Sequence, residues 1–589
     1  MTQVRDPHRA AYDGRPDALG DAMSMTIAEI REQLTGPGQL FEMEEIEIRG
    51  VRTRVWKNAP PTLRSVMELS RFHGDKVFVV YEDERITFAE HFRKAATLAN
   101  RLVDRYGVQK GDRVAIAMRN FPEWLVAFWG AAAVGAIVVP LNAWWTGAEL
   151  EYGLADSGTK VLIADGERAE RLRPHYEKLE LAGVIVARPD GDLADSEEDF
   201  DAVLGEITAD VGLPPADIEP DDDATIFYTS GTTGSPKGAL GTHRNICTNV
   251  MTLAYSGVAS AMRKRGGEVD AGAMASAASE QASMLSVPLF HVTGCHAFML
   301  GSFAFGFKLV IMHKWDPERA LELIERERVT TFGGVPAMVW QVLESPSLAT
   351  RDISSVQTIG YGGAPAPPEL VRRVNELFPG RTPSNGWGMT ETSSTVTSNS
   401  GADYTRKPDS VGPVIPVCDA RIVDDEGKDV ALGDTGELMV KGPNVVKGYW
   451  NKPEATAETF VEGWIRTGDI ARIDDEGFIY IVDRAKDMVI RGGENVYCAE
   501  VEAVLFEHPA VTDCAVFGIP HQVLGEEVGA VVQLKPGTEA TQDDLQAHCR
   551  ARLAGFKVPV QIWFWDEDLP RNPAGKVLKR DLRDQALSR

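Results

Sequence analysis

Short apolar runs alternate with helix-like segments through the central part of this chain. Each run is short and continuous, as expected of a buried β-strand. Between two of these runs, Asp316 can cap a helix that has Pro317 at its first position. Strand, helix and strand at this spacing predict parallel crossover units in an α/β fold. The predicted strands cover residues 113–118, 160–164, 184–186, 307–312 and 329–332.

One stretch, residues 124–141, is almost wholly apolar and is near the lower length limit for a membrane span. Its internal punctuation favours a different interpretation. Pro122 lies at a helix start, Gly135 can stop the helix, and the apolar run 136–139 ends at Pro140. We therefore predict a buried helix followed by a buried strand, and no transmembrane segment.

Four segments of the chain differ in pattern from the alternating strands and helices. Residues 1–60 hold a polar tail, a short predicted helix near 26–34 and a charged stretch. Residues 256–283 are rich in Ala, Ser and Gly with basic residues, which predicts a flexible surface loop. Residues 411–449 change to short strands with Gly and Asp turns, which predicts a small β subdomain. After Asp483 we expect a second α+β unit, with helices at 499–507 and 541–553 and strands at 515–519 and 528–534.

The chain has 589 residues, which is too long for one compact core. The predicted fold class is α/β. An extension at 1–60 precedes a large N-terminal domain at 61–485, built from parallel α/β subdomains and the small β subdomain. A small α+β C-terminal domain at 486–589 follows on a hinge.

Charge and cysteine usage exclude several classes of partner. The formal net charge of −26 disfavours nucleic acid and anionic membrane as main partners, although peripheral contact with a membrane stays open. The charge also repels ATP, so a nucleotide site must be locally cationic or rich in backbone N–H groups. The six Cys contain no C-x-x-C pair, so neither a zinc site nor a disulfide framework is indicated. The polar N-terminus has no signal-peptide core. We expect a cytoplasmic monomer or homodimer.

A predicted strand at 224–228 runs directly into a segment rich in Gly and hydroxyl residues. Gly lets the backbone turn its N–H groups inward, hydroxyls donate hydrogen bonds, and a lysine adds charge, so the segment can wrap a phosphate. A solvated turn needs fewer such residues and no lysine. A Walker-type loop fits poorly, because Pro236 precedes the lysine and Gly238 follows it. The candidate nucleotide residues are Thr229, Ser230, Gly231, Thr232, Thr233, Gly234 and Lys237.

The segment 228–238 resembles the phosphate-loop signature of the adenylate-forming superfamily, which includes acyl-CoA synthetases, peptide-synthetase adenylation domains and beetle luciferases. The resemblance covers roughly residues 60–585, keeps the family's motif order and is closest to fatty acyl-CoA synthetases. It implies that a carboxylate and ATP give an acyl-adenylate and pyrophosphate, and that coenzyme A then displaces AMP.

Two glycine-rich segments match the family's adenine and magnesium motifs. The first follows a strand at 356–359, and the carboxyl end of such a strand is where open α/β sheets bind ligands. In the second, Trp387 between two glycines offers a flat stacking surface, although a core aromatic residue was the alternative. The resemblance implies that Trp387 packs on adenine, Thr390 meets the α-phosphate, and Glu391 with Thr232 holds Mg²⁺. The remaining nucleotide residues are Gly363, Ala364, Pro365, Asn385, Gly386, Gly388 and Met389.

Three further motifs follow in the family order. Asp469, on a tight turn, can accept both ribose hydroxyls, and the resemblance adds Arg484 at the ribose and Lys486 as the hinge. It also implies that Gly492 and Gly493 line the channel for the pantetheine arm of CoA; a hairpin turn, in which Gly-Gly is common, is the alternative. Cys498 stands where the family most often has Pro.

Lys576 lies in a turn near the C-terminus, where a lysine is usually exposed and inert. The resemblance implies that Lys576 bridges the substrate carboxylate and the α-phosphate, whose mutual repulsion a preorganised cation offsets. Lys576 would serve adenylation, whereas Gly492 and Gly493 would serve thioester formation. The small domain should therefore rotate about Lys486 between the two steps.

The segment 287–294 matches the family segment beside the substrate carboxylate, and His291 would line or gate the acyl pocket; a satisfied core histidine is the alternative. Phe298, Met299 and Phe303 could line a tunnel opposite Gly362 and Gly363. We expect a small-molecule carboxylic acid, aliphatic by preference, with an aryl or polycyclic acid left open. Rival functions are an acyl-AMP ligase that loads a carrier protein, a luciferase-like oxygenase and a non-catalytic binding protein.

Overall fold

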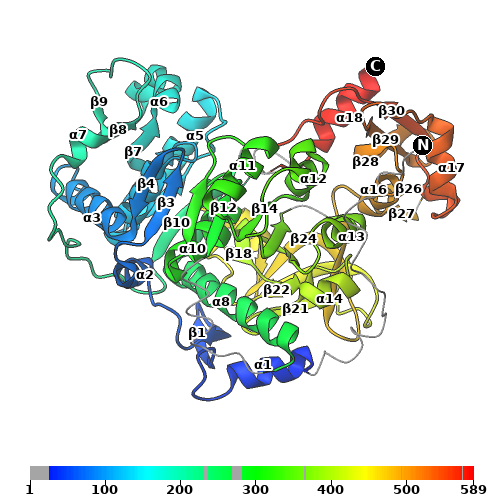
Figure 1. The fold of residues 1–589 in the computed structure, drawn as a ribbon, viewed down its shortest axis with the longest axis horizontal. Helices are drawn as coiled ribbons and strands as arrows, with labels where there is room; N and C mark the ends of the chain where they lie inside the picture. Colours follow the sequence, from blue (N-terminus) through cyan, green and yellow to red (C-terminus); the bar gives the residue numbers. More distant parts are fainter. Residues whose placement is uncertain (1–24, 230–235, 268–280, 364–365, 493, 573–574) are drawn as a thin grey trace, which may run out of the picture.

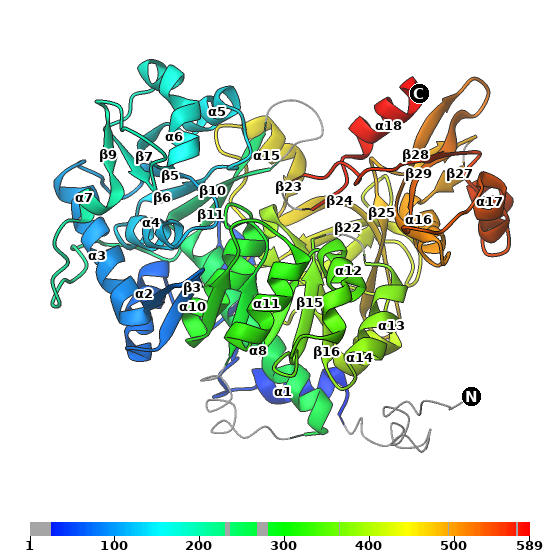
Figure 2. The same cartoon turned by 45° about the horizontal axis from the view of Figure 1, so that its top comes forward.

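The computed structural model describes residues 25–229, 236–267, 281–363, 366–492, 494–572 and 575–589. Most of the chain forms a large body of two α/β sheets and a β subdomain, and the C-terminal residues form a separate lobe at its edge (Figures 1 and 2). This arrangement confirms the predicted α/β class, with a large N-terminal part and a small C-terminal α+β unit.

The first sheet has seven strands in the order β11-β10-β6-β5-β7-β8-β9. All its neighbours are parallel except β10 and β11, which form an antiparallel hairpin. The strands predicted at 113–118, 160–164 and 184–186 are confirmed as β5, β7 and β8. The strands are β5 (Arg113–Ala117), β6 (Ile137–Pro140), β7 (Thr159–Asp165), β8 (Gly183–Ala187), β9 (Glu197–Asp199), β10 (Asp223–Thr229) and β11 (Lys237–Thr242).

The apolar stretch at 124–141 forms helix α4 (Pro122–Ala133) and strand β6, as predicted. Gly135 adopts the left-handed conformation (φ 74°) just after the helix, which a residue with a side chain would resist. Trp124 and Trp129 are completely buried between α4 and its neighbours. Within the described residues, no helix has both the length and the apolar character needed to cross a membrane.

The second sheet has eight strands in the order β19-β16-β15-β14-β12-β13-β3-β4, and its inner strands are parallel. Asp316 caps helix α11 (Pro317–Glu327) by accepting a hydrogen bond from the Arg319 N–H, as predicted. The strand expected at 329–332 begins two residues later. The strands are β3 (Val77–Tyr81), β4 (Glu84–Thr87), β12 (Ala282–Leu285), β13 (Lys308–Ile311), β14 (Thr331–Gly334), β15 (Thr358–Gly362), β16 (Thr382–Gly386) and β19 (Asn399–Ser400).

The prediction of a surface loop over 256–283 is wrong at both ends. Helix α8 (His243–Arg265) continues through the first ten of these residues, and strand β12 begins at Ala282. Buried Tyr255 and Met262 anchor the last turns of α8, and three basic residues near its C-terminus favour the helix dipole. Helical packing therefore outweighs the weak helix propensity of Ser and Gly. Residues 268–280 lie outside the described part of the chain.

The β subdomain is a six-stranded sheet that continues past residue 449 to Arg484. The N-terminal extension is part of this packing: Phe41 and Trp56 enter its core together with Tyr255 of α8. The sheet consists of β20 (Gly412–Pro413), β21 (Asp419–Val423), β22 (Gly436–Lys441), β23 (Phe460–Val461), β24 (Trp464–Ile473) and β25 (Phe478–Arg484), and the extension adds α1 (Ile27–Thr35), β1 (Met43–Ile48) and β2 (Val51–Trp56).

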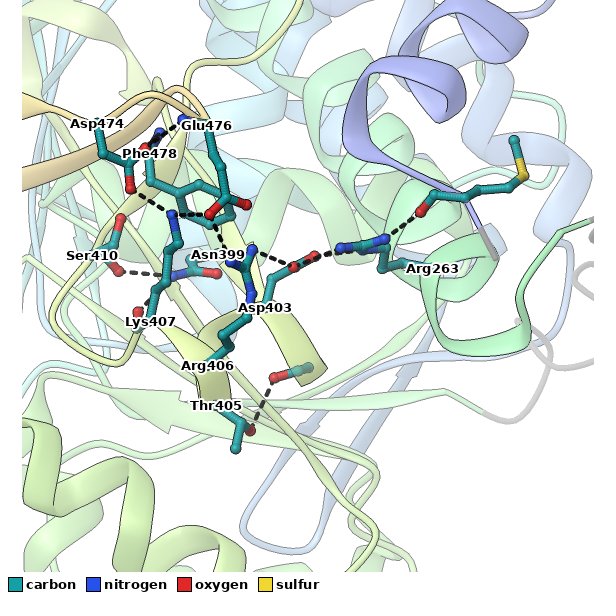
Figure 3. A network of polar contacts seen from close by, with 12 residues as sticks. Arg263, Asn399, Asp403, Thr405, Arg406, Lys407, Ser410, Asp474, Glu476 and Phe478 are labelled. Carbon is teal, nitrogen blue, oxygen red and sulfur yellow. Dashed lines mark hydrogen bonds and ion pairs between the residues drawn. The ribbon is translucent and has the colours of Figure 1, made fainter. Parts of the chain in front are cut away.

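A network of ion pairs joins α8 to the β subdomain (Figure 3). Arg263 near the end of α8 makes two parallel hydrogen bonds to Asp403, of 2.8 and 2.9 Å. Arg406 pairs with Glu476 at 2.8 Å, on the turn between β24 and β25. The network thereby fixes helix α14 (Gly401–Arg406) and the neighbouring segments that border the cleft described below.

The C-terminal unit contains a sheet in the order β27-β26-β29-β28, with β30 beside β29. This confirms the predicted α+β unit after Asp483. Its elements are β26 (Val489–Arg491), β27 (Glu494–Val496), β28 (Val511–His521), β29 (Gly525–Leu534), β30 (Gln561–Phe564), α16 (Cys498–Phe506), α17 (Gln542–Arg550) and α18 (Lys579–Ser588).

Candidate active site

A cleft of about 3280 Å³ lies between the large body and the C-terminal unit. It gathers predicted site residues that are up to 347 positions apart in the sequence, from Thr229 to Lys576. Of the predicted residues, Ser230, Gly231, Thr232, Thr233, Gly234, Ala364, Pro365 and Gly493 lie outside the described part of the chain. Those that line the cleft are Thr229, Lys237, His291, Gly363, Asn385, Gly386, Trp387, Gly388, Met389, Thr390, Glu391, Asp469, Arg484, Lys486 and Lys576.

The two ends of the predicted phosphate loop face each other across the hairpin of β10 and β11. Thr229 pairs with Lys237 in the strand register, and the Thr229 hydroxyl donates to the Lys237 carbonyl at 3.3 Å. Tyr152 donates from its hydroxyl to the Pro236 carbonyl at 3.0 Å. The Lys237 ammonium lies 5.1 Å from the centre of the Tyr449 ring. These contacts brace the two described ends of the hairpin.

Asp469 forms the centre of the predicted ribose site. It is 4% exposed, and it lies opposite Arg484 in the register of β24 and β25. Arg484 Nε is 3.2 Å from Asp469 Oδ1, and Trp387 Nε1 donates to Asp469 Oδ2 at 2.8 Å. The predicted adenine and ribose residues are thus joined by direct contacts. Sequence patterns did not reveal the bond between Trp387 and Asp469, because it spans two different sheets.

Glu391 lies on a short 3-10 turn (Thr390–Thr392) beside this centre and is 6% exposed. Tyr449 donates from its hydroxyl to Glu391 Oε1 at 2.8 Å. Burial raises the pKa of Glu391, and Tyr449, Arg484 and Lys576 act against that rise. A buried carboxylate with a disfavoured negative charge suits a divalent cation. Sequence reasoning missed Tyr449, which has no local signal beyond a preceding glycine.

The backbone around this turn is tightly constrained. Gly388 packs so closely that a Cβ atom there would lie 1.6 Å from the Ser394 carbonyl oxygen, so only glycine fits. Ser393 and Ser394 follow with φ of 50° and 99°, a region that residues with side chains avoid. Such strain is commonly retained where the surrounding structure must hold a functional group in place.

The turn that carries Lys576 is held by its own hydrogen bonds. The Lys576 N–H donates to Asn572 Oδ1 at 3.0 Å, and Arg571 donates to the Gly575 carbonyl at 2.8 Å. Gly575 has φ 77°, and a Cβ atom there would lie 2.5 Å from a Val335 methyl group of the large body. The turn therefore docks directly on the opposite wall of the cleft.

Lys576 lies close enough to the predicted nucleotide residues to interact with their charges. Its enclosed position lowers the pKa of Lys576 to about 8, with Arg484 and Lys486 adding to the effect and Asp469 and Glu391 opposing it. Burial lowers the pKa of His291 to about 4, and the neighbouring charge of Lys576 adds to this effect. His291 is thus neutral at physiological pH, and it borders the same cleft as a hydrogen-bonding group without charge.

Gly492 is not among the described residues that line the cleft. Its N–H donates to the Leu524 carbonyl at 2.8 Å, and its φ is 59°. In this arrangement Lys576 therefore lines the cleft together with the predicted nucleotide residues, whereas Gly492 does not.

Comparison with known proteins agrees with this geometry. The family described as "AMP-binding enzyme" matches residues 68–450, and its "AMP-binding enzyme C-terminal domain" matches residues 500–576. The chain belongs to the AMP-binding enzyme family. A feruloyl-CoA synthase of Amycolatopsis sp is 38% identical over 501 residues, which cover 85% of this chain and 93% of that protein. A long-chain-fatty-acid–CoA ligase of Bacillus subtilis is 34% identical, covering 89% and 94%.

Solved structures of related enzymes lead to the same family. The o-succinylbenzoate CoA synthetase of Bacillus subtilis, in complex with its acyl-adenylate intermediate, matches with a TM-score of 0.73 and 31% identity over 89% of this chain and 98% of that one. An anthranilate CoA ligase in complex with anthranoyl-AMP matches with a TM-score of 0.80 and 26% identity, covering 90% and 97%. This AMP-binding enzyme is therefore an AMP-forming acyl-CoA synthetase that uses ATP and CoA.

Two of the three residues predicted to form an acyl tunnel are core residues in this enzyme. Phe298 lines the cleft, but Met299 and Phe303 are fully buried. The Phe303 ring stacks on Trp129 with their centroids 4.0 Å apart. In the helical segment after residue 292, side chains three or four positions apart point the same way. Met299 and Phe303 therefore both point into the core and cannot face a ligand. The cleft wall here instead includes Thr293 and Ala297.

The pKa of Lys576 predicts the pH dependence of adenylation. The role predicted for Lys576, which is to offset the charge of the phosphate, requires its cationic form. We therefore expect kcat/KM for ATP in the pyrophosphate-exchange reaction to fall as the pH rises through about 8. Below that pH, Lys576 is protonated and its contribution is complete. The Lys576→Arg variant, which stays protonated, should lose this descending limb. A wild-type profile that stays level between about pH 7 and pH 9 would contradict the assignment.

Proposed function

We propose that this enzyme activates a hydrophobic carboxylic acid, of the medium- or long-chain aliphatic class, in the cleft beside Lys576. One observation carries the proposed adenylation chemistry. Lys576 comes from the C-terminal unit, yet it lines the same cleft as Asp469, Arg484 and Glu391 of the large body. A cation beside the nucleotide site favours the attack of a carboxylate on a phosphate, because both reactants are anions.

In the proposed first step, a carboxylate oxygen attacks the α-phosphorus of ATP, and the bond between that phosphorus and the bridging oxygen breaks. Pyrophosphate leaves with the electron pair. Asp469 and Arg484 hold the ribose, Trp387 packs on adenine, and Lys576 and Thr390 contact the α-phosphate. Glu391 and Thr232 would hold Mg²⁺, which would neutralise phosphate charge when bound; the buried Glu391 carboxylate described above fits that role.

In the proposed second step, the CoA thiol releases its proton to solvent and its sulfur attacks the acyl carbon. The bond between that carbon and the former carboxylate oxygen breaks, and AMP leaves with that oxygen and the electron pair. Gly492 and Gly493 are proposed to line the pantetheine channel after the C-terminal unit has turned about Lys486. The domain limits at 60/61 and 485/486 belong to this proposal. The limit at 485/486 is supported by the break between two sheets, because β25 ends at Arg484 and β26 begins at Val489.

The composition of the cleft beside His291 supports an apolar substrate. Phe290, Phe298 and Leu253 contribute apolar surface, while Gly362 and Gly363 leave the opposite wall without side chains. An aromatic acid is the second candidate, because the relatives named above include synthetases of feruloyl-CoA, o-succinylbenzoate-CoA and anthranilate-CoA.

An AMP-release assay with a panel of acids tests this proposal. We expect acid-dependent release of pyrophosphate, and AMP release that also requires CoA, with kcat/KM highest for hexadecanoate or decanoate. Ferulate, benzoate and 2-succinylbenzoate are the matched aromatic substrates. A preference for one of these by about tenfold, equivalent to 1.4 kcal/mol, would replace the aliphatic assignment. Acyl-AMP that accumulates with CoA present would favour a carrier protein as acceptor, and ADP as product would refute adenylation.

A further inference from the structure

Helix α16 starts the packed part of the C-terminal unit, and its first turn is capped from outside that unit. Within the described residues, Tyr497 at the N-cap position provides no side-chain cap. By contrast, α17 is capped by its own Thr541. The N–H of Cys498, the first residue of α16, instead donates to Oδ2 of Asp483. Asp483 belongs to β25 of the large body, on the other side of the proposed hinge residue Lys486.

Asp483 is placed for this contact by the strand that carries it. It is 6% exposed, and its Oδ1 accepts a hydrogen bond of 2.7 Å from the Arg484 N–H. Burial raises the pKa of Asp483 to about 6, so the carboxylate is mostly ionised at neutral pH. An anion at a helix N-terminus satisfies a free N–H group and interacts favourably with the helix dipole.

A chain of contacts leads from this cap to the catalytic lysine. Glu502, one turn further along α16, binds Lys579 Nζ at 2.7 Å. Lys579 is the first residue of α18 and follows Lys576 by three positions. Between these two lysines, Val577 forms a β-bridge with Arg571, which closes the turn that carries Lys576. The position of α16 against β25 therefore sets the position of Lys576 against the nucleotide residues.

Other polar contacts described between the C-terminal unit and the large body are weaker. Lys535 Nζ lies 3.8 Å from Glu344 Oε1, with both side chains more than one-third exposed. The Thr512 hydroxyl is 3.4 Å from Glu344 Oε2. Exposed pairs of this kind typically contribute less than about 1 kcal/mol. The buried carboxylate of Asp483 is the better candidate for fixing the orientation of the unit.

We propose that Asp483 is a positioning residue for adenylation: its carboxylate caps α16 across the hinge and holds Lys576 over the nucleotide site. The inference rests on the proposed two-step function. Rotation of the C-terminal unit about Lys486 would carry Cys498 away from Asp483, which stays on β25. The cap would therefore form for the first half-reaction and open for the second.

The Asp483→Asn variant tests this inference through the two half-reactions. Its amide keeps the volume but loses the charge and can turn a donor toward the Cys498 N–H. We expect ATP–pyrophosphate exchange to fall on the order of 10- to 100-fold in kcat with little change in KM for ATP, because the catalytic cation is misplaced. Thioester formation from supplied acyl-AMP and CoA should stay within about twofold of wild type. The hydrogen bond between Asp483 and Cys498 is already open in the arrangement that forms the thioester, so losing it should not slow that step.

Asp316→Asn is the matched control, because Asp316 caps α11 within the large body and away from the hinge. It should leave both half-reactions unchanged. Loss of both half-reactions in Asp483→Asn to the same extent would assign Asp483 a merely structural role, and no loss in either would also overturn the inference. If wild type itself forms no acyl-AMP with any acid, the proposed function fails, independently of this residue.

Amide hydrogen exchange on the wild-type enzyme provides a measurement that does not depend on a variant. The Cys498 amide should be protected with ATP bound, and its protection should fall when a non-hydrolysable acyl-adenylate analogue and CoA are added together. The amides of α17, which is capped within the unit, should stay equally protected in both states. Unchanged protection of Cys498 would show that the cap persists, and the inference would be wrong.

Discussion

Replacing Lys576 with alanine should lower acyl-adenylate formation by a few hundredfold, equivalent to about 3–4 kcal/mol of transition-state stabilisation. The reason is the position of its turn: Gly575 docks against Val335, and Lys576 reaches the environment of Asp469 and Glu391. No other residue of the C-terminal unit is proposed to contact the α-phosphate. The rate of ATP–pyrophosphate exchange, measured at saturating acid, gives the size of the loss.

The same variant should form the thioester from supplied acyl-AMP and CoA at nearly the wild-type rate. Lys557→Ala is the matched control, because Lys557 pairs with Glu500 inside the C-terminal unit at 2.7 Å. This control should leave pyrophosphate exchange unchanged. An equal loss of both half-reactions in Lys576→Ala would contradict the proposed division of roles between the two faces.

The second large effect is expected at Asp469. Replacing it with alanine removes the acceptor for the ribose hydroxyls and also the partner of both Arg484 and Trp387. A hydrogen bond to a charged group typically contributes about 1.5–3 kcal/mol, and the ribose would lose two of them. We therefore expect KM for ATP to rise by at least on the order of 100-fold, with a smaller change in KM for the acid. Initial rates of pyrophosphate exchange over a range of ATP concentrations measure both constants.

Two variants calibrate that result. Trp387→Phe keeps an aromatic face but loses one donor to Asp469, so KM for ATP should rise only about tenfold, equivalent to 1.4 kcal/mol. Asp474→Ala alters a carboxylate at the far turn of the same hairpin, where it pairs with Lys407, and should leave KM for ATP unchanged. A rise in KM for the acid alone in Asp469→Ala would show that the ribose assignment is wrong.

Local motifs predicted much of the site, because each is a short segment with a recognisable residue pattern, although Asp469 lies inside strand β24 and not on the predicted tight turn. Thr229, Trp387, Asp469 and Lys576 were all identified as candidates from such segments, and they line one cleft. Their mutual contacts could not be predicted. The hydrogen bond from Trp387 to Asp469 and the Tyr449 contact to Glu391 join residues that are 82 and 58 positions apart, so they depend on tertiary packing.

The wrong or missed predictions have one physical cause, which is tertiary packing. Residues 256–265 have the composition of a loop, yet Met262 is buried and holds them in α8. Phe303 looks like a pocket residue but belongs to the core beside Trp129. The extension contributes Phe41 and Trp56 to the core of the β subdomain, which its sequence pattern did not indicate. The Asp483 carboxylate that caps α16 lies 15 residues before Cys498, on strand β25, so no local capping motif indicates it.

The most direct test of the account follows an oxygen atom. The enzyme is supplied with ATP, CoA and a carboxylic acid labelled with ¹⁸O in both carboxyl oxygens, and the products are analysed by mass spectrometry. Attack of the carboxylate on the α-phosphorus, followed by attack of the thiol on the acyl carbon, predicts one ¹⁸O in every AMP and none in pyrophosphate. Unlabelled AMP, or label in inorganic phosphate formed together with ADP, would contradict the account.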